Sequence, residues 1–380
     1  MIYPHNLKIW VLAPLLETGN ENIDYYYDFS QSILEYEKVF QELKLQWQWQ
    51  YVNCSNYKNV IDEIIDSCVQ ENIQPLFFNL CDGDDVNGTP GIAVIQHLET
   101  KQVYFTGAKE FFYYITTSKA NMKKAFDEHD VPNAQWFFIK KINDINHIIE
   151  RDLKFPLIVK PAVSGGSMGV GIKNVVNNKK SLIAIVEEMF TGYKGWNLNA
   201  GGVIVESFIT GPEFTVFLTG NYLNDKQAHI YTPIERVFHE SLTDLEKFLS
   251  FDRLWEIYEN ETPMPNEENF YNYQLPNSTL IEPLKKLSWK AFEACNGTGY
   301  TRVDIRQDQK TNELFVLELN AQCGLSEDEN FTSIGAILKF SNTSFTNLVK
   351  EIIDNCINEK KSIDVSKRKN FQPDLQIIHK

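Results

Sequence analysis

The N-terminal third of the chain alternates short apolar runs with helical patterns, and this pattern limits the possible fold classes more than any other feature of the sequence. Such alternation is typical of a parallel sheet covered by helices. The loop 81–88 follows the third apolar run, and ligands of these sheets bind at the carboxyl ends of strands, so we expect this loop to face a site. We predict strands at Ile9–Leu12, Gln46–Val52 and Pro75–Leu80, and helices at Phe29–Leu43 and Val60–Val69.

The rest of the chain changes its pattern twice. A helix is expected between Thr116 and Pro132, and strands dominate from Trp136 to about Gly220. Residues 221–278 are aromatic, acidic and irregular, which favours a lid or an insertion. A helical period then returns, followed by the strands Tyr300–Arg306 and Leu314–Asn320. We therefore predict an N-terminal α/β domain (1–115), a central lobe (116–220), a C-terminal lobe with a lid insertion (221–357) and a loosely attached tail (358–380).

Charge and cysteine content narrow the partners and the compartment. The net charge of −15 argues against nucleic acid and anionic membranes, which require clustered Lys and Arg. No apolar run is long enough to span a membrane. The six cysteines form no CxxC pair, which is typical of neither a zinc ribbon nor a dense disulfide framework. We expect a cytoplasmic protein whose partners are small molecules.

The segment FPLIVKPAVSGGSMGVGIK is an apolar strand that ends in Lys160 and leads into a glycine-rich loop. Glycines let backbone N–H groups converge on an anion, while Ser167 adds a hydroxyl and Lys160 a positive charge. This combination suits a phosphate. The alternative is an ordinary glycine-rich hairpin with a solvated lysine. It is not a Walker A loop, which ends in GKS or GKT.

Two strands, GYTRVDIR and ELFVLELN, alternate polar and apolar residues. Side chains two apart in a strand share a face, so Arg302 projects with Asp304, and Glu318 with Asn320. If the strands pair as a hairpin, two carboxylates and an amide oxygen converge, which is a set of ligands suited to Mg²⁺. Arg302 can stabilise charge on a transferred phosphoryl group. The alternative, a surface hairpin, fits poorly with such apolar strands.

The segment GVIVESFITGPEFTVFL contains two glutamates in apolar strands. A buried carboxylate must be hydrogen-bonded, which makes Glu206 and Glu213 candidates for binding a ligand. Either residue could instead lie on an edge strand and face water. The histidines lack metal spacing and no GxSxG motif is present, so we do not expect a covalent protein nucleophile.

In chain order, these segments resemble the ATP-grasp superfamily, and most closely the D-alanyl-D-alanine ligases and their relatives. The similarity runs from Leu76 to Val349 through FNLCDG, YFTGA, TTSKANMKKAF, the Lys160 loop, ESFITGPEFTV, GYTRVDIR and LELN. The resemblance implies an ATP-grasp fold, in which an N-terminal parallel α/β domain precedes two α+β lobes that enclose ATP. It also allows a homodimer, since relatives are often dimers.

The resemblance further implies an ATP-dependent ligase that activates a carboxylate as an acyl phosphate and passes it to an amine. Catalysis would rest on positioning and electrostatics. The matching positions for ATP are Lys119, Lys160, Gly166, Ser167, Met168, Glu206, Phe208, Ile209 and Glu213. By the same resemblance two Mg²⁺ ions, for which Mn²⁺ could substitute, are held by Asp304, Glu318 and Asn320, while Arg302 and Ser167 act on the migrating phosphate.

Three segments depart from the ligase pattern and leave the substrates open. The opening APLLETGNEN offers only Glu17 or Glu21 in place of a family glutamate, and the lysine of the family's lid falls on Leu254, beside Arg253. After the metal strand, AQCGLSEDEN replaces a Pro-Gly turn and hydroxyls. We list Glu17, Gly324, Glu327 and Glu329 as candidate substrate contacts.

The acidic turn 327–329 has two interpretations. Its carboxylates could favour a cationic or larger acceptor, or they could cap a helix near residues 332–338. We favour an amino-acid or peptide ligase related to D-alanyl-D-alanine ligases. The alternatives are a true D-alanyl-D-alanine ligase of cell-wall synthesis and a non-catalytic nucleotide-binding module. The intact set of Arg302, Asp304, Glu318 and Asn320 counts against the last.

Overall fold

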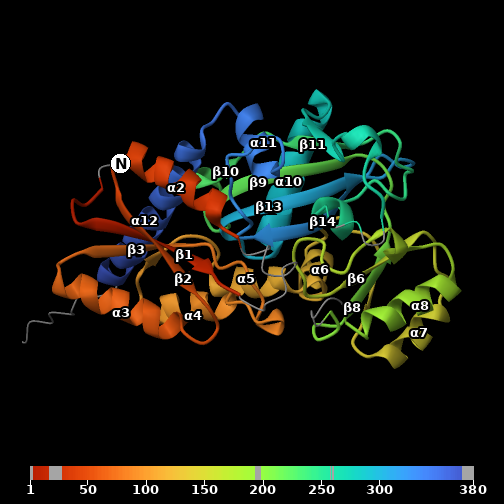
Figure 1. Cartoon of the computed structure of the whole chain (residues 1–380), viewed down its shortest axis with the longest axis horizontal. Coiled ribbons are helices and arrows are strands. Elements are labelled where there is room, and N and C mark those ends of the chain that lie inside the picture. Colours follow the sequence, from red (N-terminus) through yellow and green to blue (C-terminus); the bar gives the residue numbers. More distant parts are fainter. Residues whose placement is uncertain (1–2, 17–27, 193–197, 257, 259–260, 370–380) are drawn as a thin grey trace, which may run out of the picture.

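Three sheets, each covered by helices, lie in a row across the molecule (Figure 1). The computed structural model describes residues 3–16, 28–192, 198–256, 258 and 261–369, with the side chains of 267 and 360–369 left out. The N-terminal sheet lies at one end, a large antiparallel sheet occupies the middle, and a small sheet lies at the other end.

The N-terminal sheet is wholly parallel, with strand order β2-β1-β3-β4. The sequence therefore predicted this unit correctly: all three expected strands and both helices form, each within a few residues of its expected bounds. The loop after β3 leaves the carboxyl end of the sheet, as expected for a site. The elements are β1 (Leu7–Pro14), α2 (Ser30–Leu43), β2 (Gln46–Val52), α3 (Tyr57–Gln70), β3 (Gln74–Asn79), α4 (Ile92–Thr100), β4 (Tyr104–Phe105) and α5 (Glu110–Thr117).

The small sheet at the other end has strand order β5-β8-β6-β7, and helices α7 and α8 cover it (Figure 1). Its apolar side chains form a separate core around Val159 and Val205. The glycine-rich loop leaves this sheet at the end of β6. The connecting helix is α6 (Lys119–Glu128), and the unit comprises β5 (Trp136–Ile139), α7 (Ile145–Ile149), β6 (Leu157–Pro161), β7 (Val175–Val176), α8 (Lys179–Met189) and β8 (Val203–Ser207).

The large sheet runs β12-β11-β9-β13-β14, with β10 paired to β9. The predicted hairpin forms: β13 and β14 are antiparallel, with Asp304 opposite Glu318 and Arg302 opposite Asn320. The elements are β9 (Glu213–Asn221), β10 (His229–Ile230), β11 (Ile234–Phe238), α9 (Phe251–Leu254), β12 (Tyr271–Gln274), α10 (Ser278–Ala294), β13 (Thr298–Gln307), β14 (Leu314–Ala321), α11 (Ser333–Phe340) and α12 (Phe345–Lys369).

Three expectations about the organisation need correction. Strand β9 pairs with β13 in the large sheet, so the sheets favour a lobe boundary near Gly211 instead of Gly220. Residues 221–278 are less irregular than expected, because β11 and β12 extend the same sheet. The tail is helical as far as Lys369: α12 contacts α2, β4 and β13, and Asn221 donates a 2.7 Å hydrogen bond to Glu359.

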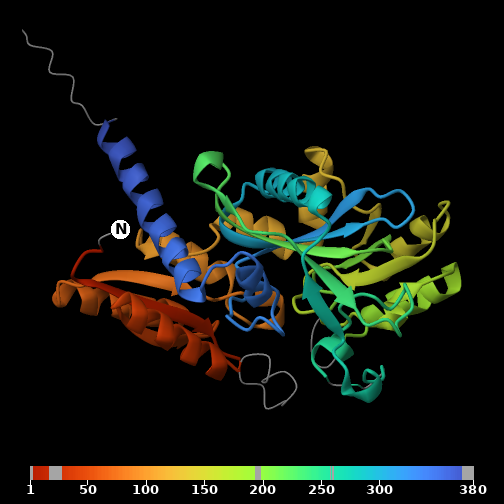
Figure 2. The ribbon, with the colours of Figure 1, turned by 90° about the horizontal axis from the view of Figure 1, so that it is seen from above.

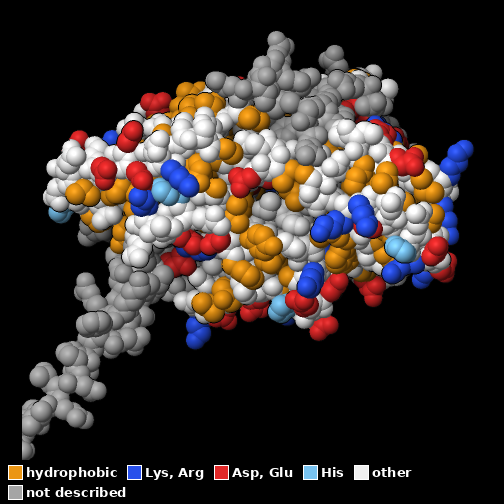
Figure 3. Space-filling view, turned by 90° about the horizontal axis from the view of Figure 1, so that it is seen from below, with side chains coloured by type: hydrophobic (Ala, Val, Ile, Leu, Met, Phe, Trp, Pro, Cys, Tyr) orange, Lys and Arg blue, Asp and Glu red, His pale blue; other side chains and the backbone are white. Residues whose placement is uncertain are grey.

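The N-terminal sheet and the large sheet are packed together by shared cores. One cluster joins Trp10 and Phe77 of the first sheet to Val303 of the large sheet, and a second joins Ile9 to Tyr300 and α12. Figure 2 shows α12 lying alongside the N-terminal unit. On the face in Figure 3, acidic side chains are interspersed with basic ones. None of the helices in the described chain is both long and apolar enough to cross a membrane.

Candidate active site

A cavity of about 570 Å³ lies where the three sheets meet. Each sheet supplies part of its wall: the loop after β3 from the first, β6 and β8 from the small sheet, and β9, β13 and β14 from the large one. The fold thus gathers residues that are far apart in the sequence. The predicted residues that line it are Lys119, Lys160, Gly166, Ser167, Glu206, Phe208, Ile209, Glu213, Arg302, Asp304, Glu318, Asn320 and Gly324.

Glu206 is the centre of a buried charge cluster on one side of the cavity. Lys160 and Lys123 each place Nζ 2.6 Å from one of its carboxylate oxygens. Burial alone would raise the pKa of the Glu206 carboxyl, but the two ammonium groups outweigh it and lower the pKa to about 2. Burial would lower the pKa of Lys160, yet Glu206 and Glu318 raise it. Both groups therefore stay charged at neutral pH.

Glu213 is held in the same way by two arginines. Arg306 donates to Oε2 from Nη2 (2.8 Å) and Nε (3.0 Å), and Arg236 pairs with Oε1. Burial would raise the pKa of the Glu213 carboxyl, but the guanidinium charges lower it. Arg306 also donates to the Ile209 carbonyl at 2.8 Å. Because these bonds fix the wall at Phe208 and Ile209, the cavity has a rigid apolar face suited to a planar base.

Asp304, Glu318 and Asn320 occupy one face of the β13–β14 hairpin. Asp304 accepts hydrogen bonds from Thr215 (3.0 Å), from Arg302 (Nη2, 2.9 Å) and from the Asn320 amide nitrogen (3.0 Å). That last bond leaves the amide oxygen of Asn320 free to bind a cation. Arg302 is half-buried beside Asp304, and the charge of Asp304 raises the pKa of the guanidinium although partial burial opposes the rise.

The donor set fits a divalent cation that also binds phosphate oxygens. Asp304 and Glu318 are register partners, so their carboxylates project from adjacent positions into the cavity. Lys119 lies at the same edge, with Nζ 3.7 Å from Glu318 and 3.1 Å from the Ser164 carbonyl. No cluster of three or more His, Cys, Asp or Glu side chains suited to a metal occurs among the described residues. The protein thus supplies two carboxylates, and the remaining ligands would have to come from substrate and water.

The glycine-rich loop turns through left-handed backbone conformations at Gly166 (φ 51°) and Ser167 (φ 61°). Among the described residues, nothing accepts a hydrogen bond from the N–H groups of these two residues. Met168 differs from the expectation: its N–H donates to the Gly165 carbonyl and its side chain is buried in the core of the small sheet. The loop therefore offers Gly166 and Ser167 to an anion, but not Met168.

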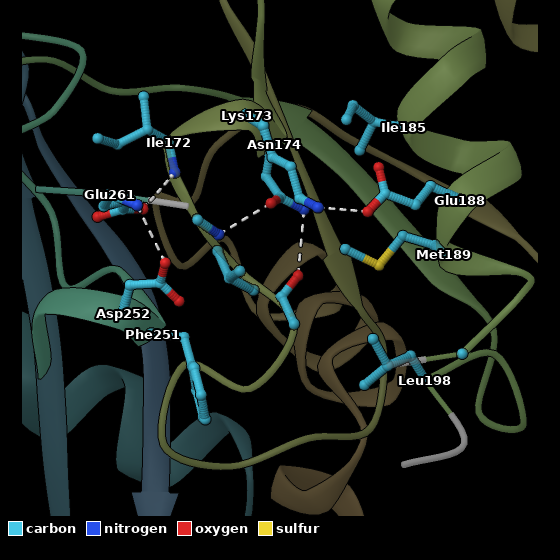
Figure 4. A pocket seen from close by; sticks show the side chains of 14 residues that line it. Ile172, Lys173, Asn174, Ile185, Glu188, Met189, Leu198, Phe251, Asp252 and Glu261 are labelled. Carbon is cyan, nitrogen blue, oxygen red and sulfur yellow. Dashed lines mark hydrogen bonds and ion pairs between the residues drawn. The ribbon is translucent and has the colours of Figure 1, made fainter. Parts of the chain in front are cut away.

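The segment around α9 is fastened to this loop, as Figure 4 shows for Glu261. One Glu261 oxygen accepts a hydrogen bond from the Ile172 N–H (2.8 Å) and the other accepts one from Ser250. The Trp255 indole donates to the Gly166 carbonyl at 2.9 Å. Arg253, which stands beside the position of the family's lid lysine, is buried next to Glu261 (3.6 Å) and does not line the cavity. Trp255 and Glu261 are thus fastened to the glycine-rich loop and its continuation at Ile172.

The acidic turn lies outside the cavity. Glu327 pairs with Lys38 of α2 (2.8 Å) and Glu329 with Lys339 of α11 (2.7 Å), and neither of these two expected substrate contacts lines the cavity. The capping interpretation is also wrong for these two residues, because the Thr332 hydroxyl accepts the Gly335 N–H and caps α11. Glu17 and Glu21 lie outside the described residues.

Several residues of the site were missed from the sequence. Lys123 follows Lys119 by one helical turn, a spacing that could have been noticed. Arg306 continues the alternation of Arg302 and Asp304 along β13. Arg236 had no local signal. The aromatic wall and the acid of the β3 loop were not singled out either; they comprise Tyr271, Tyr273, Phe331 and Asp82.

Comparison with known proteins agrees with this geometry. The family model described as the D-ala D-ala ligase C-terminus matches residues 126–354, more than half of the chain. This chain belongs to the D-alanine–D-alanine ligase family. It is 25% identical over 278 residues to a D-alanine–D-alanine ligase of Treponema denticola and 26% identical over 266 residues to the uncharacterized protein y4sG of Sinorhizobium fredii. These alignments cover 70% and 68% of this chain, and 66% and 67% of the relatives.

Solved structures of the family share the fold. The D-alanine–D-alanine ligase of Bacillus anthracis complexed with ATP aligns with a TM-score of 0.65 at 18% identity, over 94% of this chain and 99% of that one. The VanG D-Ala:D-Ser ligase of Enterococcus faecalis gives 0.64 at 17% identity, over 94% and 100%. The predicted ATP-grasp fold and the class of ATP-dependent ligase are thereby confirmed.

Proposed function

We propose that this protein uses ATP to activate the carboxylate of an amino acid or peptide as an acyl phosphate, and then joins it to the amine of a second one. The observation that carries the proposal is the shared cavity. Lys119 and Lys160 lie in it with the carboxylates of Asp304 and Glu318 and the guanidinium of Arg302. Cations for a triphosphate and anions for its metal ions thus meet in one enclosed space.

The nucleotide would lie along the small sheet. Phe208 and Ile209 form the apolar wall for the base, Lys160 meets the phosphates, and the N–H groups of Gly166 and Ser167 close over them. Glu213, held by two arginines, remains the candidate for the ribose hydroxyls.

The carboxylates of the hairpin would hold the metal ions. Asp304, Glu318 and Asn320 suit two Mg²⁺ ions, which Mn²⁺ could replace, and bound ions would neutralise charge on the phosphates. Arg302 stabilises the phosphoryl group during transfer, because its guanidinium is fixed by Asp304 and lines the cavity.

The substrates are amino acids or peptides of a size that the cavity admits. Phe29, Tyr271, Tyr273 and Phe331 also line this cavity, and aromatic walls suit a side chain larger than a methyl group. The names of the relatives favour the second candidate, joining of two D-alanines in cell-wall synthesis. All six cysteines are free, five of them buried, which suits a reducing cytoplasm.

Phosphate release with ATP and Mg²⁺, measured with D- and L-amino acids singly and in pairs, tests the proposal. We expect release that requires a second amino acid, with the dipeptide identified by mass spectrometry. Efficient joining of two D-alanines would select the second candidate. Tight ATP binding without release for any pair would contradict the proposal and favour a nucleotide-binding module.

A further inference from the structure

Asp82 is a carboxylate of the cavity that none of the proposed roles uses. It follows β3 in the FNLCDG segment, and its side chain is exposed to the cavity that also contains Arg302 and Asp304. The backbone around it is fixed, because the Asp82 N–H donates to the Leu80 carbonyl (2.8 Å) and the Tyr113 hydroxyl donates to the Gly83 carbonyl (2.7 Å). The position of the backbone that carries this side chain is therefore determined by the fold.

The other acids of the cavity are already paired with basic side chains. Glu206 has two lysines, Glu213 has two arginines, Asp304 has Arg302, and Glu318 faces Lys119. Within the described chain, no lysine or arginine forms an ion pair with Asp82. The charge of Arg302 acts on it from a distance, but that guanidinium is directed at Asp304. Asp82 therefore presents to the cavity a carboxyl group that has no basic partner among the described residues.

We propose that Asp82 binds the ammonium group of the acceptor and takes a proton from it, so that the resulting amine can attack the acyl phosphate. This inference rests on the proposed function. An ammonium nitrogen has no lone pair and cannot attack. One N–H proton moves to the Asp82 carboxylate, the freed lone pair forms the C–N bond, and the C–O bond to phosphate breaks. Phosphate leaves with that electron pair and accepts the second proton.

The surroundings of Asp82 suit a base. The carboxyl of Asp82 is open to the cavity, but the protein atoms around it reduce its hydration and raise its pKa to about 7. The charge of Arg302 and a hydrogen bond from Tyr113 oppose this rise, and Asp84 adds to it. A general base works best when its pKa is close to the working pH. The titratable and charged groups that face it from the surrounding elements are Arg302 and Tyr300 on β13, Tyr113 on α5, Cys323 after β14 and Asp84 on its own loop.

The test compares two amines in the Asp82→Asn variant. Hydroxylamine is largely uncharged at neutral pH and traps an acyl phosphate as a hydroxamate without needing a base. The amino-acid acceptor that gives the most phosphate release in the screen does need one. We expect hydroxamate formation within about twofold of the unmodified protein, and amide formation lower by about 10² to 10⁴, the usual contribution of a general base. Asp85→Asn, on the same loop but outside the cavity lining, is the matched control and should change neither rate.

The possible outcomes distinguish a failure of the role of Asp82 from a failure of the proposed ligase function. Amide formation by Asp82→Asn at the unmodified rate, or an equal loss of both products, overturns the role of Asp82 and leaves the ligase proposal standing. An unmodified protein that forms neither product with any donor contradicts the proposed function itself. If Asp82→Asn does not fold, Asp82→Glu replaces it in the test. If residue 82 is the base, the rate of amide formation should still rise with pH, but the midpoint of the rise should differ from that of the unmodified protein. A pH profile equal to that of the unmodified protein overturns the role of Asp82.

Discussion

Replacement of Lys123 by Met tests the buried charge cluster most directly. The side chains of Lys123 and Glu206 are 1% and 3% exposed, with 2.6 Å between Nζ and Oε2. Removing one partner of a buried ion pair costs about 3 to 5 kcal/mol, because the other charge is left without compensation. Glu206 keeps Lys160 at 2.6 Å, so we expect a loss at the lower end, about 3 kcal/mol. Urea unfolding followed by circular dichroism measures it.

Lys124→Met is the matched control on the same helix. Lys124 is 73% exposed and lies 3.8 Å from Glu128, and exposed pairs contribute about 0 to 1 kcal/mol. The two single variants should therefore differ clearly in unfolding midpoint. Equal midpoints for the two lysine variants would refute the claim that Glu206 needs both of its cations.

Three further predictions concern the same cavity. Glu318→Gln should abolish phosphate release while circular dichroism shows an intact fold, because this carboxylate is proposed to be shared by two metal ions; normal turnover would remove that assignment. Lys160→Ala should weaken ATP binding, measured by calorimetry, by about 1.5 to 3 kcal/mol, the value of a charge-assisted contact, and unchanged affinity would contradict its role. The lowered pKa of the Glu206 carboxyl stabilises the folded state at pH values above 4.5, the ordinary pKa of a glutamate. This stabilisation is lost as the pH falls from 4.5 to about 2, so the melting temperature should drop in that interval. The drop should be smaller in Lys123→Met.

The alternation of polar and apolar residues along single strands was enough to predict which side chains of those strands share a face. The alternation in GYTRVDIR and ELFVLELN placed Asp304 and Glu318 on one face, and the hairpin register agrees. Partners that lie far away in the sequence left no such signal. Glu213 was a candidate for a buried acid from its apolar strand, with a water-facing edge strand as the alternative. Its partners Arg236 and Arg306 could be assigned only once β9 was known to lie between β11 and β13.

For the C-terminal tail and for residues 221–278, composition led to a wrong expectation, because tertiary packing determines their structure. The last residues of α12 are polar, yet the helix begins with buried residues such as Phe345 and Leu348, and helix formation propagates from such an anchored start. The aromatic stretch 221–278 looked irregular because its three sheet strands, β10, β11 and β12, are short. Tyr271 and Tyr273 on β12 alternate in a run of only four residues, too short for the period to stand out.

The last prediction concerns the acidic turn 327–329, and it differs from the expectation that these acids select the acceptor. A carboxylate selects an acceptor only if it reaches the acceptor, and Glu327 and Glu329 instead bind Lys38 and Lys339 on the outer surface. These four side chains are 38% to 56% exposed, so each pair contributes about 0 to 1 kcal/mol. Replacing both glutamates with Ser should therefore leave the acceptor preference unchanged and lower the unfolding free energy by less than about 2 kcal/mol. A changed ratio of kcat/KM between two acceptors would show that the turn enters the cavity when substrates bind, and would return acceptor selection to these acids.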